Sequence, residues 1–224
     1  MVSRQQAGEL FSTGTAEEEA YRHVLKGIRT GRLLPGTRLI PEDIAGEIGM
    51  SRMPVREAFR RLSTEGLVLI RPNRGCTVAG LTTDEMVEVF EIRSVLEGLA
   101  VRLAVPRLDA EALAELERLL ARMQVTGRGD DDWVTRHREF HEYLCSFSRR
   151  PKLIHQILRL HVTIEPYLRI WLHHAEKPLS AEEDHRTVID AIRAGDAAVA
   201  ERVVQKHILD TAPALVAFVA RTER

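Results

Sequence analysis

The stretch 51–75, SRMPVREAFRRLSTEGLVLIRPNRG, leaves few folds open to the N-terminal part of this sequence. Its first half has apolar residues at helical spacing, and a run of aliphatic residues then leads into the turn sequence PNRG. The stretch carries six arginines and two glutamates, whereas the formal net charge of the whole chain is −1. A basic helix followed by a basic hairpin in a nearly neutral protein is typical of a surface that contacts a phosphate backbone.

The segments around this stretch predict a compact arrangement of three helices and two strands. A helix is expected over 17–30, and a second, short helix begins at Pro41, because proline is favoured in the first turn of a helix. A turn that contains glycine separates it from the third helix, for which Ser51 is the candidate N-cap residue. Helix, turn, helix and hairpin in this order predict a winged helix-turn-helix domain, whose third helix enters the major groove of DNA.

This part of the sequence resembles the DNA-binding domain of the GntR family of bacterial regulators. The resemblance rests on the signature S-R-x-P-V-R-E-A-x-x-x-L, followed by E-G-L-V and R-G-x-x-V, within residues 36–79. It implies that the start of the third helix and the tip of the wing contact DNA, through Ser51, Arg52, Met53, Arg56, Asn73, Arg74 and Gly75. Some relatives have a DNA-contacting arginine where this chain has Glu42, so that contact is expected to be absent here. Arg60 and Arg61 lie two turns into the helix and are expected to contact phosphates or solvent.

From residue 83 onward the pattern predicts helices and no strands. Six helices are expected, over 83–105, 109–125, 131–147, 151–174, 180–194 and 196–221. The first of them has an apolar stripe that is expected to face the core, made of Val89, Ile92, Leu96, Leu99 and Leu103. The loops are short enough for antiparallel neighbours, so the helices are predicted to form a bundle.

These patterns predict a mostly α chain with two domains. We expect a flexible tail at 1–14, the winged helix-turn-helix domain at 15–80 and an all-α antiparallel bundle at 83–224. The first 80 residues hold 12 Lys and Arg and 9 Asp and Glu, whereas the remaining residues hold 20 and 24. A basic front and an acidic back indicate two different tasks.

The bundle resembles the FCD ligand-binding domain, which marks the FadR branch of the GntR family. The resemblance rests on EIRSVLEGLAVRLA, REFHEYL, SAEEDHRTVIDAIRAGD and QKH, which span most of residues 88–207. Six helices favour the VanR-like version of this domain over the seven-helix version that binds acyl-CoA. The resemblance implies that the bundle binds a small effector and holds a homodimer together.

Four histidines are candidate ligands of a metal ion. His137 and His141 are one helical turn apart on one face, so both imidazoles can reach one ion, although this spacing is common in helices that bind no metal. The FCD pattern implies that His141, His185 and His207, from three helices, bind a metal. The family usually has an aspartate one turn before the first of these, where this chain has His137. Either His137 completes an all-nitrogen site, or three histidine ligands remain.

The donor set determines which metal and which effector are expected. Imidazole suits Zn²⁺, Ni²⁺, Cu²⁺ and Fe²⁺, whereas Mg²⁺ and Ca²⁺ prefer oxygen ligands, so we expect Zn²⁺ or Ni²⁺. In metal-binding relatives an arginine at the position of Arg93 helps hold a ligand carboxylate. A guanidinium beside a divalent ion suits a small organic acid. The alternative for Arg93 is an ion pair with Glu97, one turn later. The other histidines of the bundle match no motif and are expected to be packing or surface residues, namely His155, His161, His173 and His174.

The sequence also indicates where the protein works. It has no signal peptide and no run of about 18 apolar residues that would predict a membrane-spanning helix. Its two cysteines, Cys76 and Cys145, fit no ligand or redox motif. A reduced, cytoplasmic protein without a membrane partner is therefore expected.

Together these features predict a ligand-responsive transcription regulator and not an enzyme. The expected partners are a double-stranded DNA operator, a second copy of the chain and a small organic acid, whose binding near the metal releases a repressor from DNA. Two alternatives stay open. In the first, the bundle only dimerises and its histidines are core residues. In the second it is a histidine-metal hydrolase, although no acidic residue lies in a motif that would supply its general base.

Overall fold

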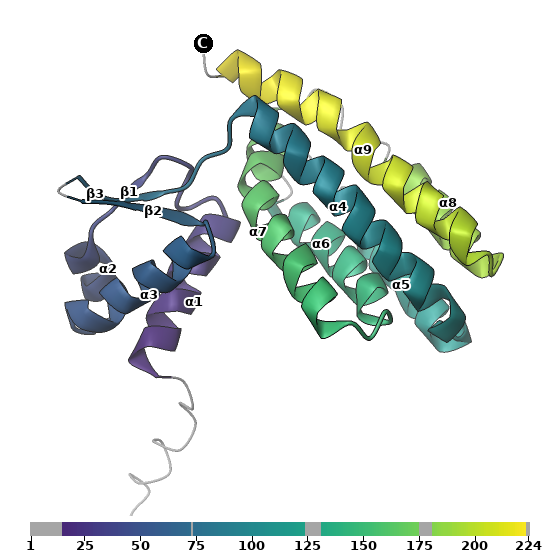
Figure 1. The fold of residues 1–224 in the computed structure, drawn as a ribbon, viewed down its shortest axis with the longest axis horizontal. Coiled ribbons are helices and arrows are strands. Elements are labelled where there is room, and N and C mark those ends of the chain that lie inside the picture. The colour runs from purple at the N-terminus through teal and green to yellow at the C-terminus, as the bar shows by residue number, and fades with distance from the viewer. Residues whose placement is uncertain (1–14, 73, 124–130, 175–180, 223–224) are drawn as a thin grey trace, which may run out of the picture. The chain divides into compact units, whose positions relative to one another are not determined.

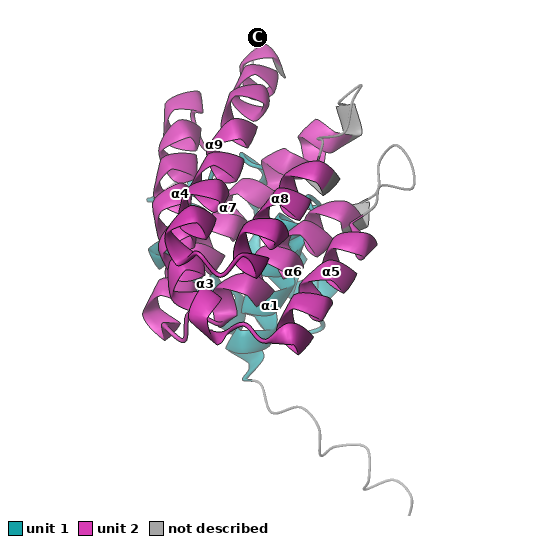
Figure 2. Ribbon diagram, turned by 90° about the vertical axis from the view of Figure 1, so that its right-hand side faces the viewer, with its two compact units in different colours: residues 1–80 teal, residues 81–224 magenta. Residues whose placement is uncertain are grey.

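The computed structural model describes four ranges of the chain, residues 15–72, 74–123, 131–174 and 181–222. It divides the chain into two compact units, residues 1–80 and 81–224, which Figure 2 shows in different colours. Helices dominate both units, and the strands found in the described ranges all lie in the first unit. The mostly α fold class is confirmed. The tail predicted at 1–14 lies outside the described residues.

Three helices and a three-stranded sheet form the first unit (Figure 1). In chain order the elements are α1 (Ala16–Arg29), β1 (Arg38–Leu39), α2 (Pro41–Glu47), α3 (Arg52–Thr64), β2 (Val68–Arg71) and β3 (Gly75–Val78). The sheet is antiparallel with the strand order β1-β3-β2, so β2 and β3 form the hairpin of the wing. The winged helix-turn-helix prediction is confirmed. The sequence does not predict strand β1, because two residues are too few to show an alternating pattern of apolar and polar side chains.

Local signals explain where these helices begin and end. Thr15 caps α1, since its side chain accepts a hydrogen bond from the backbone N–H of Glu18 at 3.2 Å. Pro41 lies in the first turn of α2, and Gly49 after that helix adopts a φ of 67°. Ser51 occupies the N-cap position of α3, but its side chain makes no capping hydrogen bond. Helices α1 and α3 pack together over an apolar core that includes Ala20, Val24, Ile28, Val55, Ala58, Phe59 and Leu62.

Six α-helices and one short 3-10 turn make up the described part of the second unit. They are α4 (Thr83–Ala104), η1 (Val105–Arg107), α5 (Ala110–Arg122), α6 (Asp131–Ser146), α7 (Pro151–His174), α8 (Ala181–Arg193) and α9 (Ala197–Thr222). The predicted helices are therefore confirmed in type and order. Thr82 and Glu85 form a reciprocal capping box at the start of α4, and Asp109 caps α5 by accepting from the backbone N–H of Ala112 at 2.8 Å.

Helix α4 is the centre of the bundle. It runs beside α9 and also packs against α6 and α7 (Figure 1). Gly98 permits the close approach of α9, because a Cβ at this position would lie 2.7 Å from Cγ of Gln205. The predicted buried stripe of α4 is right for Val89 and wrong for Ile92, whose side chain is 42% exposed. The reason is that a helix covered by several neighbours is apolar around much of its circumference, so periodicity does not select a single buried face.

Helix α9 is both long and apolar. Within the described ranges, Ala197–Arg221 alone has the length and composition that would allow a helix to cross a membrane. Core helices of soluble proteins meet the same criterion, and α9 packs against α4, α7 and α8. The expectation that no helix spans a membrane stays a prediction.

Candidate functional site

The exposed start of α3 is the first candidate site. Ser51, Arg52, Met53 and Arg56 are all exposed, and Met53 is 63% exposed although it is apolar. The opposite face of α3 holds the apolar residues that pack in the core of the first unit. A helix buried in this way must present its basic N-terminal face to solvent. The side chains at the start of α3 that the resemblance connects with DNA are therefore accessible to solvent.

The wing carries a second exposed basic group. Arg74 and Gly75 are exposed at the turn between β2 and β3, and Gly75 has a φ of 90°, a conformation that favours glycine. Asn73 lies outside the described residues. Arg38 on β1 joins this group, since a Cβ at Gly75 would lie 3.6 Å from Nε of Arg38. The sequence pattern does not reveal Arg38, because only the pairing of β1 with β3 brings it beside the wing.

Ion pairs distinguish the arginines of the first unit. Nη1 of Arg52 donates to Oε1 of Glu42 at 2.9 Å. This hydrogen bond, together with the charges of Arg52 and Arg56, lowers the pKa of the Glu42 carboxyl. Arg61 pairs with Glu18 of α1 at 2.6 Å. Position 42, where some relatives have a DNA-contacting arginine, is thus occupied here by a glutamate that interacts with the two arginines at the start of α3.

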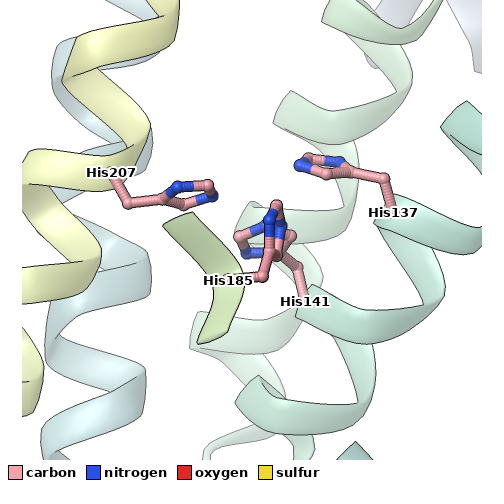
Figure 3. Close-up of side chains that lie close together, drawn as sticks. All are labelled: His137, His141, His185 and His207. Carbon is pink, nitrogen blue, oxygen red and sulfur yellow. The ribbon is translucent and has the colours of Figure 1, made fainter. Parts of the chain in front are cut away.

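Four histidines converge inside the second unit, as Figure 3 shows. Helix α6 provides His137 and His141, α8 provides His185 and α9 provides His207. One candidate ligand atom from each lies within 4.8 Å of all the others. Nε2 of His141 and Nε2 of His185 are 3.3 Å apart. The fold therefore brings together all four histidines that the sequence singles out, and His137 lies within the cluster.

Burial favours the neutral form of three of these imidazoles, those of His137, His141 and His207. The side chains of His141 and His185 are almost completely buried. Burial lowers the pKa of His141 to about 4, against the opposing effect of Glu97, and lowers the pKa of His207 to about 3. Burial and the neighbouring histidines also hold the pKa of His137 well below its usual value. A neutral imidazole has a free lone pair at pH 7, which is the form that binds a metal.

The donor set suits a divalent transition metal. A tetrahedral zinc ion with Zn–N distances of about 2.0–2.1 Å has ligand nitrogens roughly 3.3–3.4 Å apart. The separation of 3.3 Å between His141 and His185 agrees with that spacing. The widest separation, 4.8 Å, exceeds it, so the farthest rings would have to turn inward. Nδ1 of His207 is buried and has no hydrogen-bond partner in the described part of the chain, which leaves it available as a ligand.

A buried carboxylate lies behind the histidine cluster. Glu97 of α4 is 0% exposed, and its Oε2 is 3.0 Å from Nδ1 of His141. Its Oε1 accepts from Nε of Arg93 at 2.9 Å and is 2.9 Å from Nε2 of His161. Burial alone would raise the pKa of Glu97, but Arg93 and the two histidines outweigh it and hold the pKa well below its usual range. His161 is therefore more than the packing or surface residue expected from the sequence, where 64 positions separate it from Glu97.

Arg93 borders the space beside the histidines. A cavity of about 10 Å³ is lined by Arg93, Trp133 and three of the clustered histidines, together with Phe90, Leu168, Ile208 and Thr211. A second cavity of about 10 Å³ is lined by Arg93, His161 and Arg138, among others. Each has room for about one water molecule or a bare ion. Arg93 thus forms the ion pair with Glu97 that was the alternative expectation, and it also faces the candidate ligand space.

Comparisons with known proteins agree with this two-part architecture. Residues 16–78 match the model of the family described as bacterial regulatory proteins, gntR family, and residues 88–210 match the FCD domain. The chain is 30% identical to the "Uncharacterized HTH-type transcriptional regulator YdhC" of Bacillus subtilis, over 84% of this chain and 85% of that protein. It is 31% identical to a "Probable D-xylose utilization operon transcriptional repressor" of Paenarthrobacter nicotinovorans, over 89% and 88%. Among solved structures, "E. coli McbR/YncC" matches with a TM-score of 0.78 and 27% identity, over 94% of this chain and all of that one.

Proposed function

The chain belongs to the gntR family of bacterial regulatory proteins and carries an FCD domain, and from this premise we propose how it acts as a ligand-responsive repressor. It is a DNA-binding transcription regulator and not an enzyme. The hydrolase alternative gains no support, since the relatives that match over most of the chain are named as transcriptional regulators or repressors. Such a regulator needs an operator to bind and an effector that changes its affinity for that operator.

The first unit binds one half-site of a DNA operator. The start of α3 enters the major groove, and the wing follows the backbone beside it. The support is the exposure of the predicted contact residues that the structure describes, Ser51, Arg52, Met53, Arg56, Arg74 and Gly75. Arg38 adds a cation beside the wing. The protein therefore acts in the bacterial cytoplasm, where the chromosome is.

Two copies of the chain bind the operator together, because one winged helix-turn-helix contacts only about one half-site. The bundle offers a surface for the second copy on α4. Val87, Ile92 and Val95 are 40%, 42% and 59% exposed on this helix. Apolar side chains that stay in water on a central core helix are stabilised when a second copy covers them.

The second unit holds a divalent transition metal, Zn²⁺ or Ni²⁺, through His137, His141, His185 and His207. The observation that carries this proposal is the convergence of four histidines from three helices, with ligand atoms within 4.8 Å of one another. When bound, such an ion supplies a strong positive charge and a coordination position for a carboxylate oxygen. The protein contributes neutral imidazoles, a buried site and the neighbouring guanidinium of Arg93.

The effector is a small organic acid, and its entry moves the helices. The guanidinium of Arg93 borders the cavity beside the histidines, where it can hold a carboxylate. That cavity of about 10 Å³ is too small for an organic acid, so binding must displace the packed helices around it. Two states of the bundle that differ in this way bind the effector unequally, which is the condition for a ligand to shift a conformational equilibrium.

Elemental analysis of the untagged protein tests the metal centre. We expect close to one equivalent of Zn²⁺ or Ni²⁺ in the wild type and its loss in His141→Ala. The matched control is His155→Ala, which removes a histidine of α7 outside the cluster and should keep the metal. Absence of metal from the wild type, even after incubation with Zn²⁺ and Ni²⁺, would refute the centre and favour a bundle that only dimerises.

A further inference from the structure

Glu97 contacts side chains of two other helices from inside the bundle. It lies on α4 and is 0% exposed, and it reaches His141 on α6 and His161 on α7. Oε1 lies 2.9 Å from Nε2 of His161, and Oε2 lies 3.0 Å from Nδ1 of His141, within reach of a hydrogen bond although the ring is not aligned for one. Arg93, one turn earlier on α4, donates to Oε1 from Nε at 2.9 Å. The ionised carboxylate is balanced by this guanidinium, which is why it can be buried.

The contact with His141 determines which ring nitrogen carries the proton. An ionised carboxylate can only accept hydrogen bonds, so the atom that faces it, Nδ1, is the protonated one in a neutral imidazole. Nε2 is then left with a free lone pair. Nε2 is also the atom of His141 that faces the other histidines, 3.3 Å from Nε2 of His185. The lone pair that a metal needs is therefore directed into the cluster.

We infer that Glu97 is a positioning residue of the metal centre, whose carboxylate fixes the Nδ1–H tautomer and the ring orientation of His141. A carboxylate behind a metal-binding histidine is a general device for orienting the ligand and raising its basicity. The inference rests on the proposed metal centre. It goes beyond it by assigning a role to a residue that neither touches the metal nor belongs to the histidine cluster.

The same carboxylate also positions Arg93. Among the described residues Arg93 hydrogen-bonds to Glu97 through Nε, and its side chain lines both small cavities beside the cluster. One buried group thereby orients a metal ligand and the arginine proposed to hold the effector. If effector binding moves Arg93 or His141, the shared contact with Glu97 transmits that movement to the other residue.

The tautomer of His141 is measured on the metal-free wild type by long-range ¹H–¹⁵N correlation spectra of histidine-labelled protein at pH 7, with His141→Gln used to assign the signals. We expect Nδ1 to be protonated and Nε2 to be bare. A predominant Nε2–H tautomer would overturn the inference. This measurement needs no change at Glu97, so it decides the question even if a variant there does not fold.

Metal affinity provides the second readout, by competition of Zn²⁺ against a chromophoric chelator. The amide of Glu97→Gln has one acceptor oxygen in place of the two carboxylate oxygens that face Arg93, His141 and His161. We therefore expect His141 to lose its preference for the Nδ1–H tautomer and the Zn²⁺ affinity to fall about 10- to 100-fold. The matched control is Glu165→Gln, which removes another buried carboxylate, one that pairs with Arg138 at 2.7 Å, and should keep both the tautomer and the affinity. Equal affinities of the two variants would refute the role of Glu97. A wild type that takes up no Zn²⁺ would refute the metal centre itself.

Discussion

Mild acid should destabilise the metal-free bundle, because its clustered histidines are buried in the neutral form. In the unfolded chain a histidine titrates near pH 6.5, whereas burial lowers the pKa of His141 to about 4. Between these two values the unfolded state binds a proton that the folded state does not. The free energy of unfolding therefore falls as the pH falls from 6.5 toward 4, and is independent of this group above 6.5.

The two pKa values of His141 set the size of the effect. From pH 7 to pH 5 this one histidine lowers the free energy of unfolding by about 2 kcal/mol, since each pKa unit corresponds to about 1.4 kcal/mol. His137 and His207 act in the same direction. Glu97 does not interfere in this window, because a carboxyl whose pKa is held below the ordinary value of 4.5 loses its contribution only below that pH.

Urea unfolding of chelator-treated protein at pH 7 and pH 5, followed by tryptophan fluorescence, measures this effect. The two tryptophans of the chain, Trp133 and Trp171, are both buried in the second unit, so the signal reports on the bundle alone. His141→Gln should remove about 2 kcal/mol of the difference between the two pH values. His155→Gln, at a position outside the cluster, should leave it unchanged. Equal stability of the wild type at both pH values, or full pH dependence in His141→Gln, would refute the reasoning.

Three further predictions concern DNA and effector binding. Arg52→Ala and Arg56→Ala should each abolish gel-shift binding to a duplex selected from a random pool by the wild type, with unchanged circular dichroism; binding at wild-type affinity would contradict the assignment of α3. Glu42→Gln frees Arg52 and should raise affinity for a mixed-sequence duplex, with a salt slope steeper by about 0.9 for one additional phosphate contact; the neighbouring Asp43→Asn removes the same charge, so equal effects would exclude a specific role of the Glu42–Arg52 pair. Arg93→Lys keeps the charge beside Glu97 but loses the planar guanidinium that can bind a carboxylate through two hydrogen bonds. About tenfold more acetate, lactate or citrate should therefore be needed to raise the unfolding temperature of the variant as much as that of the wild type, while the Zn²⁺ content stays the same.

The sequence predicts those features that depend on near neighbours in the chain. Helical periodicity and capping residues reveal the helices, and the spacing of His137 and His141 places two candidate ligands on one face. Strand β1 is invisible because it exists only through its pairing with β3. The sequence does not predict the exposure of Ile92. Helix α4 packs against several neighbours and is apolar around much of its circumference, so periodicity does not separate its exposed apolar residues from its buried ones.

The network behind the histidines depends on contacts that are distant in the chain. His161 is 64 positions from Glu97, and no spacing rule connects them. The sequence indicates Glu97 only as a partner of Arg93 on the same helix. A charged residue on a helix face that is otherwise apolar is nevertheless a usable signal, because a buried charge requires a charged or hydrogen-bonding partner nearby.

In the proposed metal centre, the side chain at position 137 sets the net positive charge. A divalent ion held by four neutral imidazoles retains its full charge, and the charge of Arg93 is already balanced by its ion pair with Glu97. The uncompensated charge is then available to an effector carboxylate, whereas His137→Asp supplies a carboxylate from the protein. We therefore expect His137→Asp to bind small carboxylates more weakly and to shift metal preference from Zn²⁺ and Ni²⁺ toward Mn²⁺, because its oxygen is a harder ligand. Competition titrations with Zn²⁺ and Mn²⁺ measure the preference, and His137→Ala provides the control for loss of the ring. If His137→Ala binds Zn²⁺ as tightly as the wild type, His137 is not a ligand, and the charge of the centre must be explained by three histidines alone.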